Sequence, residues 1–118
     1  MSDAEKRQHH RFLALLEVRV LPGDRVPADL KLVTIDIGTG GARCASNRPL
    51  DADAPLKLTL TLIGGELRQP AMVDVEAKVL RCTVRAAAIE SRRYEIALEF
   101  THVEAEDKKR LEGYLNNL

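Results

Sequence analysis

Apolar and polar residues alternate with a period of two along most of the chain, which is the pattern of half-buried β-strands. The alternation is clearest from Leu56 to Ile63, where four leucines alternate with one lysine and two threonines. Glycines, prolines and aspartates, which favour turns, separate the alternating runs. The pattern predicts six strands: Phe12–Leu21, Leu30–Ile37, Ala42–Ser46, Leu56–Ile63, a long strand that begins at Val73, and Tyr94–Phe100.

The second expected strand contains an apolar set and a polar set that alternate. We expect Val33, Ile35 and Ile37 to share one face of this strand. Thr34 and Asp36 would then lie on the opposite face.

The fifth expected strand changes its phase part of the way along. From Val73 to Val79 the odd-numbered positions are apolar, whereas from Leu80 to Val84 the even-numbered positions are apolar. A shift of one residue indicates a β-bulge near Val79 and Leu80. Such a bulge would bend the strand around a corner of a barrel.

The C-terminal residues follow the period of an amphipathic helix instead. We expect this helix over residues 103–118. Thr101, followed three residues later by Glu104, has the form of a capping box at its start. The apolar positions at i, i+3, i+4 and i+7 spacing, which would pack against the strands, are Leu111, Tyr114, Leu115 and Leu118.

Six short strands followed by one helix indicate a mainly β fold, an antiparallel barrel or a sandwich. A chain of 118 residues, 45% of them apolar, is expected to form a single domain. We expect a mobile arm in residues 1–11, the β core in 12–100 and the helix in 103–118. The chain shows no signal peptide and no run as long as a membrane span, so we expect a cytoplasmic protein that does not contact a membrane.

The charge balance disfavours a general nucleic-acid binder. Lys plus Arg and Asp plus Glu each number 18, so the net charge is zero, whereas polyanion-binding domains usually carry a basic surplus. Aromatic residues make up 3% of the chain and tryptophan is absent, which leaves few platforms on which single-stranded bases could stack. A nucleic-acid-binding barrel is therefore less favoured than the two functions described below. A gel-shift test with single-stranded RNA or DNA would decide whether the protein binds nucleic acid.

The residues that could support catalysis are few. The histidines are His9, His10 and His102, and they form no convincing set of nucleophile, base and orienting acid. Cys44 and Cys82 are far apart, and no spacing resembles a zinc site. We therefore expect no enzyme, no metal and no cofactor. We expect the two cysteines to be free, partly buried thiols.

Two short motifs carry the candidate chemistry. Arg7 and Arg11 lie in the polar arm, and an arginine can bind phosphate or the edge of guanine with two parallel hydrogen bonds. At the end of the second strand, Asp36 precedes a turn with three glycines in residues 38–41. Asp36 can accept hydrogen bonds from guanine, and glycine permits positive φ and lets a ligand approach bare backbone.

Taken in order, these features resemble the PilZ domain, the bacterial receptor module for cyclic di-GMP. Residues 7–11 match the family's Arg-x-x-x-Arg motif in full. Residues 36–41, Asp-Ile-Gly-Thr-Gly-Gly, match its Asp/Asn-x-Ser-x-x-Gly motif at Asp36 and Gly41. The resemblance continues through the later strands to the closing helix. It implies a six-stranded antiparallel β-barrel with a C-terminal α-helix and a flexible N-terminal arm.

The resemblance also implies a role for each motif residue. Arg7 and Arg11 would hold guanine and phosphate groups of cyclic di-GMP, Asp36 would bind a guanine edge, and Gly41 would let the backbone pass beneath the ligand. Gly38 stands where the family has serine, so the hydrogen bond of that hydroxyl is absent. Binding would order the arm and so change the surface that a partner protein meets.

Two functions follow from this resemblance. The first is a cyclic di-GMP receptor that acts on an unidentified effector protein in motility, adhesion or exopolysaccharide control, as a monomer or a homodimer. The second is a degenerate PilZ-like module that does not bind the nucleotide and acts through protein–protein contacts. The intact arginine pair favours the first, and Gly38 favours the second.

Overall fold

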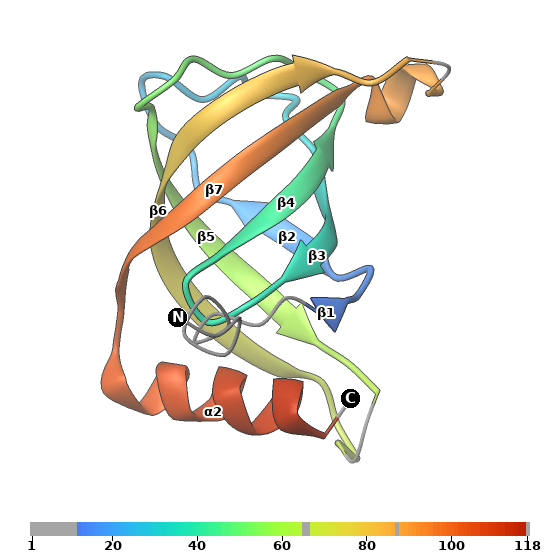
Figure 1. The fold of residues 1–118 in the computed structure, drawn as a ribbon. Coiled ribbons are helices and arrows are strands. Elements are labelled where there is room, and N and C mark those ends of the chain that lie inside the picture. The colour runs from blue at the N-terminus through green and yellow to red at the C-terminus, as the bar shows by residue number, and fades with distance from the viewer. Residues whose placement is uncertain (1–11, 65–66, 87, 118) are drawn as a thin grey trace, which may run out of the picture.

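The computed structural model describes residues 12–64, 67–86 and 88–117, and shows a β-barrel with a helix at one end (Figure 1). The expected N-terminal arm lies outside these ranges. The elements are β1 (Phe12–Leu13), β2 (Glu17–Val20), β3 (Leu32–Ile37), β4 (Gly41–Ser46), β5 (Pro55–Leu62), β6 (Ala71–Val84), the 3₁₀ helix η1 (Glu90–Arg92), β7 (Tyr94–Val103) and α2 (Ala105–Asn116).

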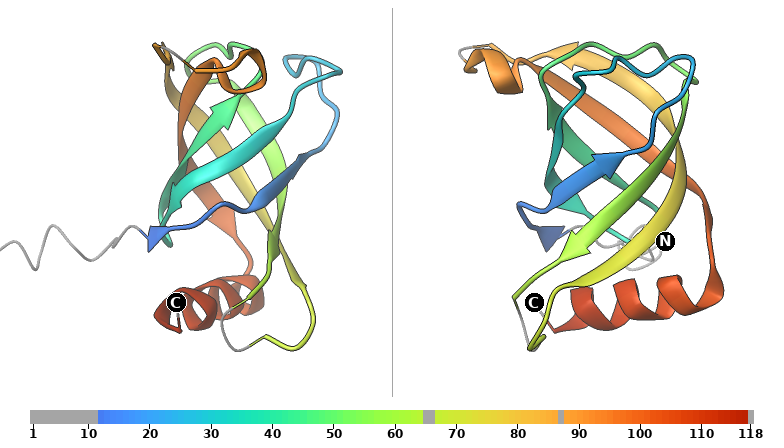
Figure 2. Two further views of the ribbon diagram at one scale, coloured as in Figure 1. Left: turned by 90° about the vertical axis from the view of Figure 1, so that its right-hand side faces the viewer. Right: turned by 180° about the vertical axis from the view of Figure 1, so that it is seen from behind.

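Six of the strands form a closed ring. They pair antiparallel in the order β3, β2, β5, β6, β7 and β4, and β4 pairs again with β3. The views from the side and from behind show the strands wrapping around a common axis (Figure 2). Because the ring closes, the fold is a barrel rather than a sandwich. The predicted six-stranded antiparallel barrel with a C-terminal helix is confirmed.

The first predicted strand is split into β1 and β2, and a threonine bridges the break. The backbone N–H of Leu16 donates to Thr34 Oγ1 over 2.7 Å, and the same hydroxyl donates to the carbonyl of Ala14 over 2.5 Å. The Thr34 side chain, which is fully buried, thus replaces part of the β-ladder between the two chain segments. Both pieces still pair with β3, so the ring remains continuous.

Replacing Thr34 by valine should therefore lower the free energy of unfolding by about 1–3 kcal/mol, because Leu16 N–H and Ala14 C=O would lose their buried partner. Valine keeps the shape of threonine, so the change tests the hydroxyl rather than the packing. Urea denaturation measures the effect. Thr61→Val, on the half-buried face of β5, is the matched control and should change stability by less than about 0.5 kcal/mol. Equal effects of both substitutions would contradict the bridging role.

The predicted faces of β3 are wrong. Thr34 is fully buried and Asp36 is 4% exposed, whereas Val33 and Ile35 are only half-buried. The cause is a register shift between Thr34 and Asp36 in the pairing of β3 with β4, which reverses the alternation at Ile35. The regular alternation from Val33 to Ile37 gives no sequence signal for such a shift.

The predicted bulge in β6 is confirmed. Val79 pairs with Leu98 and Arg81 pairs with Ala97, so Leu80 has no partner of its own on β7. A second register shift in the same pair of strands, between Glu76 and Ala77 of β6, was not expected. The two irregularities let the long strands β6 and β7 bend around the barrel.

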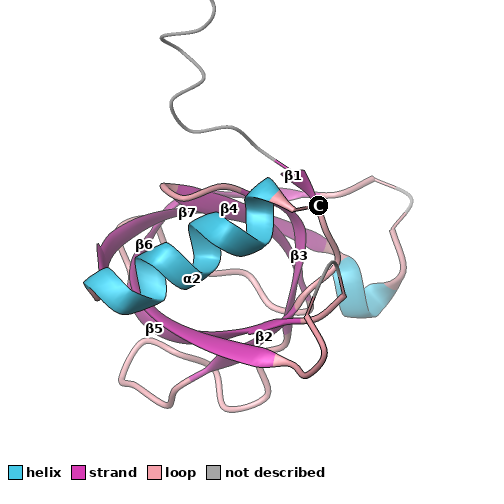
Figure 3. Cartoon of the chain, turned by 90° about the horizontal axis from the view of Figure 1, so that it is seen from below, coloured by secondary structure: helices cyan, strands magenta, loops and turns pink. Residues whose placement is uncertain are grey.

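The helix α2 lies across one end of the barrel (Figure 3). Its buried side chains are Leu111, Tyr114 and Leu115, as the periodicity predicted, and the fourth predicted position, Leu118, lies outside the described residues. The Tyr114 hydroxyl donates to the carbonyl of Ile63 over 2.6 Å, which ties the helix to the chain beyond β5. The helix begins at Ala105 and extends to Asn116, within the expected range of residues 103–118.

The predicted capping box does not form. Thr101 belongs to β7, and Glu104, at the N-cap position, makes no side-chain capping bond. The Glu104 carboxylate instead forms a hydrogen bond with the His102 side chain, with Oε1 lying 3.0 Å from Nε2. Because β7 runs past Phe100 to Val103, Thr101 is part of a strand and does not cap the helix.

Cys44 and Cys82 form no disulfide, as expected. Cys44 of β4 and Cys82 of β6 both lie opposite Ile96 of β7, on its two sides. Two strand spacings separate them, roughly 10 Å. This exceeds the reach of a disulfide, which requires Cα atoms within about 7 Å.

Candidate functional site

The glycine turn joins β3 to β4 at the end of the barrel toward which α2 lies (Figure 1). The backbone N–H of Gly38 donates to the carbonyl of Gly41 over 2.9 Å and closes the turn. The N–H of Phe100 donates to the carbonyl of Gly40 over 2.9 Å, so β7 also holds the turn. Among the described residues, positive φ occurs at Asp53 and Gly64 and not at the glycines of this turn. The glycines of this turn therefore do not use the positive φ that glycine permits.

Gly41 is required for a different reason, which is the close approach of β7. A Cβ atom on Gly41 would lie 2.3 Å from the backbone carbonyl oxygen of Leu98. In the ladder between β4 and β7, Gly41 pairs with Glu99, the residue that follows Leu98. Only a residue without a side chain allows the two strands to pack at this distance.

Asp36 lies at the end of β3 and is held by an arginine across the hairpin. Arg43 Nε donates to Asp36 Oδ2 over 2.5 Å, and Arg43 Nη2 also contacts Oδ2. The Asp36 side chain is 6% exposed and that of Arg43 is 40% exposed, so the guanidinium covers the carboxylate. The hydrogen bond from Arg43 to Asp36 and the charge of Asp36 raise the pKa of the Arg43 guanidinium above its ordinary value. Arg43 therefore stays charged.

A second carboxylate holds Arg43 from β7. Arg43 Nη1 lies 3.4 Å from Glu95 Oε2, and the Glu95 side chain is 25% exposed. Sequence reasoning missed both residues. The pairing of Asp36 with Arg43 across a short turn carries a detectable signal, since opposite charges face each other in a hairpin. Glu95 carries no such signal, because β7 is distant in the chain.

The structure brings together three of the five predicted site residues, Asp36, Gly38 and Gly41, in the β3–β4 hairpin. The other two, Arg7 and Arg11, lie outside the described residues. β1 pairs with the end of β3, with Phe12 opposite Ile37 and Leu13 opposite Asp36. The residue that directly follows Arg11 in the sequence is thus fixed beside the glycine turn.

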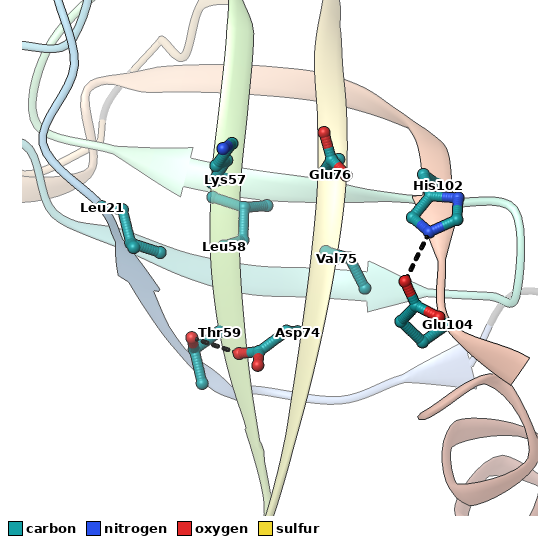
Figure 4. Close-up of a pocket in the computed structure, with 9 residues that line it drawn as sticks. All are labelled: Leu21, Lys57, Leu58, Thr59, Asp74, Val75, Glu76, His102 and Glu104. Atoms are coloured by element: carbon teal, nitrogen blue, oxygen red, sulfur yellow. Dashed lines mark hydrogen bonds and ion pairs between the residues drawn. The ribbon is translucent and has the colours of Figure 1, made fainter. Parts of the chain in front are cut away.

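A surface hollow of about 330 Å³ lies elsewhere, over the outer face of β5 and β6 and beside the end of β7 (Figure 4). Within it Thr59 Oγ1 donates to Asp74 over 2.7 Å. His102 forms a hydrogen bond with Glu104. This bond and the negative charge of Glu104 raise the pKa of His102 above its ordinary value. The described residues that line the hollow include none from the β3–β4 hairpin. The side chains joined by dashed lines in Figure 4, Thr59 with Asp74 and His102 with Glu104, serve as hydrogen-bond partners for each other.

Within the described ranges, no group of three or more His, Cys, Asp or Glu side chains is arranged to hold a metal ion. No helix in this part of the chain has the length and apolar character that crossing a bilayer requires.

Comparisons with known proteins agree with this architecture. The family model for the PilZ domain matches residues 5–117. Among solved structures, the Bacillus subtilis inhibitor of motility, MotI/DgrA, is similar with a TM-score of 0.71 and 22% sequence identity. The match covers 93% of this chain and 50% of that one, so this chain spans about half the length of that protein. At this identity the likeness shows the fold. No curated protein matches the chain significantly.

Proposed function

The chain belongs to the PilZ domain family, and from this premise we propose that it is a receptor for cyclic di-GMP that signals to a partner protein in the cytoplasm. The family consists of receptor and adaptor modules, and we propose no catalytic activity for this member. One observation supports the proposal above all. The pairing of Phe12 with Ile37 fixes the chain that follows the arginine motif beside Asp36 and Gly41, the residues of the second motif.

In the proposed complex the arginine motif, residues 7–11, and the second motif, residues 36–41, bind the same ligand. Arg7 and Arg11 bind phosphate and guanine groups, since a guanidinium donates two parallel hydrogen bonds to either. Asp36 accepts from the N1 and N2 donors of guanine. Gly41 lets β7 pack closely against the turn beside the ligand, and Gly38 offers only its backbone there. Ordering of residues 1–11 around the nucleotide then presents a new surface to the partner.

Titration calorimetry of cyclic di-GMP into the purified protein tests the proposal. We expect binding at micromolar concentration or tighter. Cyclic di-AMP is the matched control ligand, because it has the same phosphates without the guanine donors that Asp36 would bind. Absence of heat with cyclic di-GMP, at protein and ligand concentrations far above micromolar, would exclude the receptor function.

The glycine at position 38 leads to a separate prediction. Restoring the family's serine, Gly38→Ser, should tighten cyclic di-GMP binding about fivefold, because one hydrogen bond of about 1 kcal/mol is regained. Parallel titrations of the two proteins measure the ratio of dissociation constants. Gly40→Ser, in the same turn but outside the motif's serine position, is the control and should not tighten binding. A serine at position 38 that leaves affinity unchanged would show that the hydroxyl has no role here.

The second candidate function is a PilZ module that no longer binds the nucleotide, and Gly38 is the observation that favours it. Such a module would act through protein–protein contacts alone. The solved neighbour is titled an inhibitor of motility, and we include a motility component among the effectors proposed for either function, beside adhesion and exopolysaccharide control. We propose that the protein acts as a monomer or a homodimer.

A further inference from the structure

We propose that Arg43 is a positioning residue for the cyclic di-GMP site, which fixes the carboxylate of Asp36 and is itself fixed by Glu95. This inference rests on the proposed function of the site. It adds two residues that belong to neither sequence motif. Neither is required to touch the ligand.

The three side chains form a continuous chain of ionic hydrogen bonds across three strands. Asp36 is on β3, Arg43 on β4 and Glu95 on β7. Two nitrogen atoms of the guanidinium contact the same oxygen, Asp36 Oδ2, and the third nitrogen faces Glu95 Oε2 at 3.4 Å. Each end of the guanidinium is therefore occupied by a carboxylate. This arrangement restricts both the rotation of the arginine and that of the aspartate.

Positioning matters because guanine recognition demands a fixed acceptor. The N1 and N2 donors of guanine lie in one plane, so the aspartate must present an ionised oxygen in a set direction. The Asp36 side chain is nearly buried, and a buried charge requires a paired opposite charge. Arg43 supplies that counter-charge and also fixes the orientation of the carboxylate.

The presence of Glu95 argues for positioning rather than for simple attraction. Cyclic di-GMP carries two negative charges on its phosphates, so a carboxylate near its site repels it. A site built only to attract the ligand would do better without Glu95. Its contact with Arg43 offers a reason for its place, because it holds the guanidinium against Asp36.

Glu95→Gln therefore gives a test whose sign separates the two explanations. If Glu95 acts through Arg43, the substitution should weaken cyclic di-GMP binding about threefold in calorimetry, although it removes a negative charge. If charge alone matters, the same substitution should tighten binding. Glu99→Gln is the matched control, because Glu99 is also on β7 but pairs with Lys78 at 3.7 Å instead of Arg43. It should leave affinity unchanged or slightly higher.

Substitutions at Arg43 complete the test. Arg43→Gln should weaken binding about tenfold, and Arg43→Lys should restore little of that loss, because an ammonium cannot bridge both carboxylates as the planar fork does. The double variant Arg43→Gln/Glu95→Gln should bind no more weakly than Arg43→Gln alone. Thermal unfolding of every variant verifies that the barrel is intact.

The outcomes separate the two levels of the proposal. Absence of cyclic di-GMP binding by the unaltered protein would overturn the receptor function and this inference with it. Binding by the unaltered protein together with full affinity in Arg43→Gln, full rescue by Arg43→Lys, or tighter binding in Glu95→Gln would overturn the positioning role alone. Weaker binding in Glu95→Gln, with Glu99→Gln unaffected, would support it.

Discussion

Replacing Gly41 by alanine is expected to lower the free energy of unfolding by about 3 kcal/mol. The new Cβ would lie 2.3 Å from the carbonyl oxygen of Leu98, a distance that no pair of these atoms tolerates. The obstacle is backbone, so no side-chain rotation relieves the contact, and β4 and β7 must separate. This pair of strands closes the barrel, and Leu98 is in its core. Chemical denaturation followed by circular dichroism measures the loss.

Gly113→Ala supplies the matched control with the opposite sign. Gly113 lies within α2, and nothing is within 4 Å of the Cβ that an alanine would add there. Alanine is the better helix former, so this variant should gain about 0.5–1 kcal/mol. A Gly41→Ala variant as stable as the unaltered protein would show that the strands separate without cost, and that the glycine of the motif has no structural role.

Replacing Arg11 by alanine is expected to weaken cyclic di-GMP binding by roughly 100-fold, if the proposed function holds. A guanidinium that donates two hydrogen bonds to a phosphate or to guanine contributes about 1.5–3 kcal/mol, and the upper value corresponds to this factor. The substitution removes the guanidinium that would bind the ligand. Calorimetry gives the affinity, and thermal unfolding of both proteins verifies that the variant is folded.

Arg19→Ala is the control for this substitution. Arg19 is an exposed arginine of β2 and pairs with Thr59, outside both motifs. Its loss changes the net charge by the same amount as the loss of Arg11. Similar weakening in both variants would mean that the arginines act only through the overall charge of the protein, and the role assigned to the Arg-x-x-x-Arg motif would be wrong.

The strands were predictable because a half-buried strand has apolar residues on one face and polar residues on the other, and these alternate in the sequence. The alternation of leucines placed β5 within one residue at each end, and the change of phase at Leu80 located a bulge. The apolar spacing of Leu111, Tyr114 and Leu115 gave the buried face of α2. In each case the pattern extends over several residues and has one dominant physical cause, the burial of apolar surface.

The failures share a different cause. The break between β1 and β2 depends on one hydroxyl, that of Thr34, which lies in a different strand. The reversal of faces at Ile35 depends on a register shift in the pairing of β3 with β4. Likewise, Glu95 reaches Arg43 only because β7 lies beside β4. Tertiary pairings of this kind leave no local pattern. The motif residues of the candidate site could be identified from sequence, and the pairing of Asp36 with Arg43 across the hairpin also carries a signal, but the contact of Arg43 with Glu95 could not be identified.

The pairing of β4 with β7 also sets the order in which the protein can be assembled during synthesis. The β3–β4 hairpin, in which Asp36 lies opposite Arg43, is synthesised before β7. Its second partner, β7, is the last strand of the barrel in the sequence, and it brings Glu95, Leu98 and the N–H of Phe100 that binds the turn. Because such distant pairings form slowly, the hairpin lacks this partner until β7 has been synthesised and has paired with it. The site is thus completed at the same step that completes the barrel, and a chain truncated before β7 would lack both.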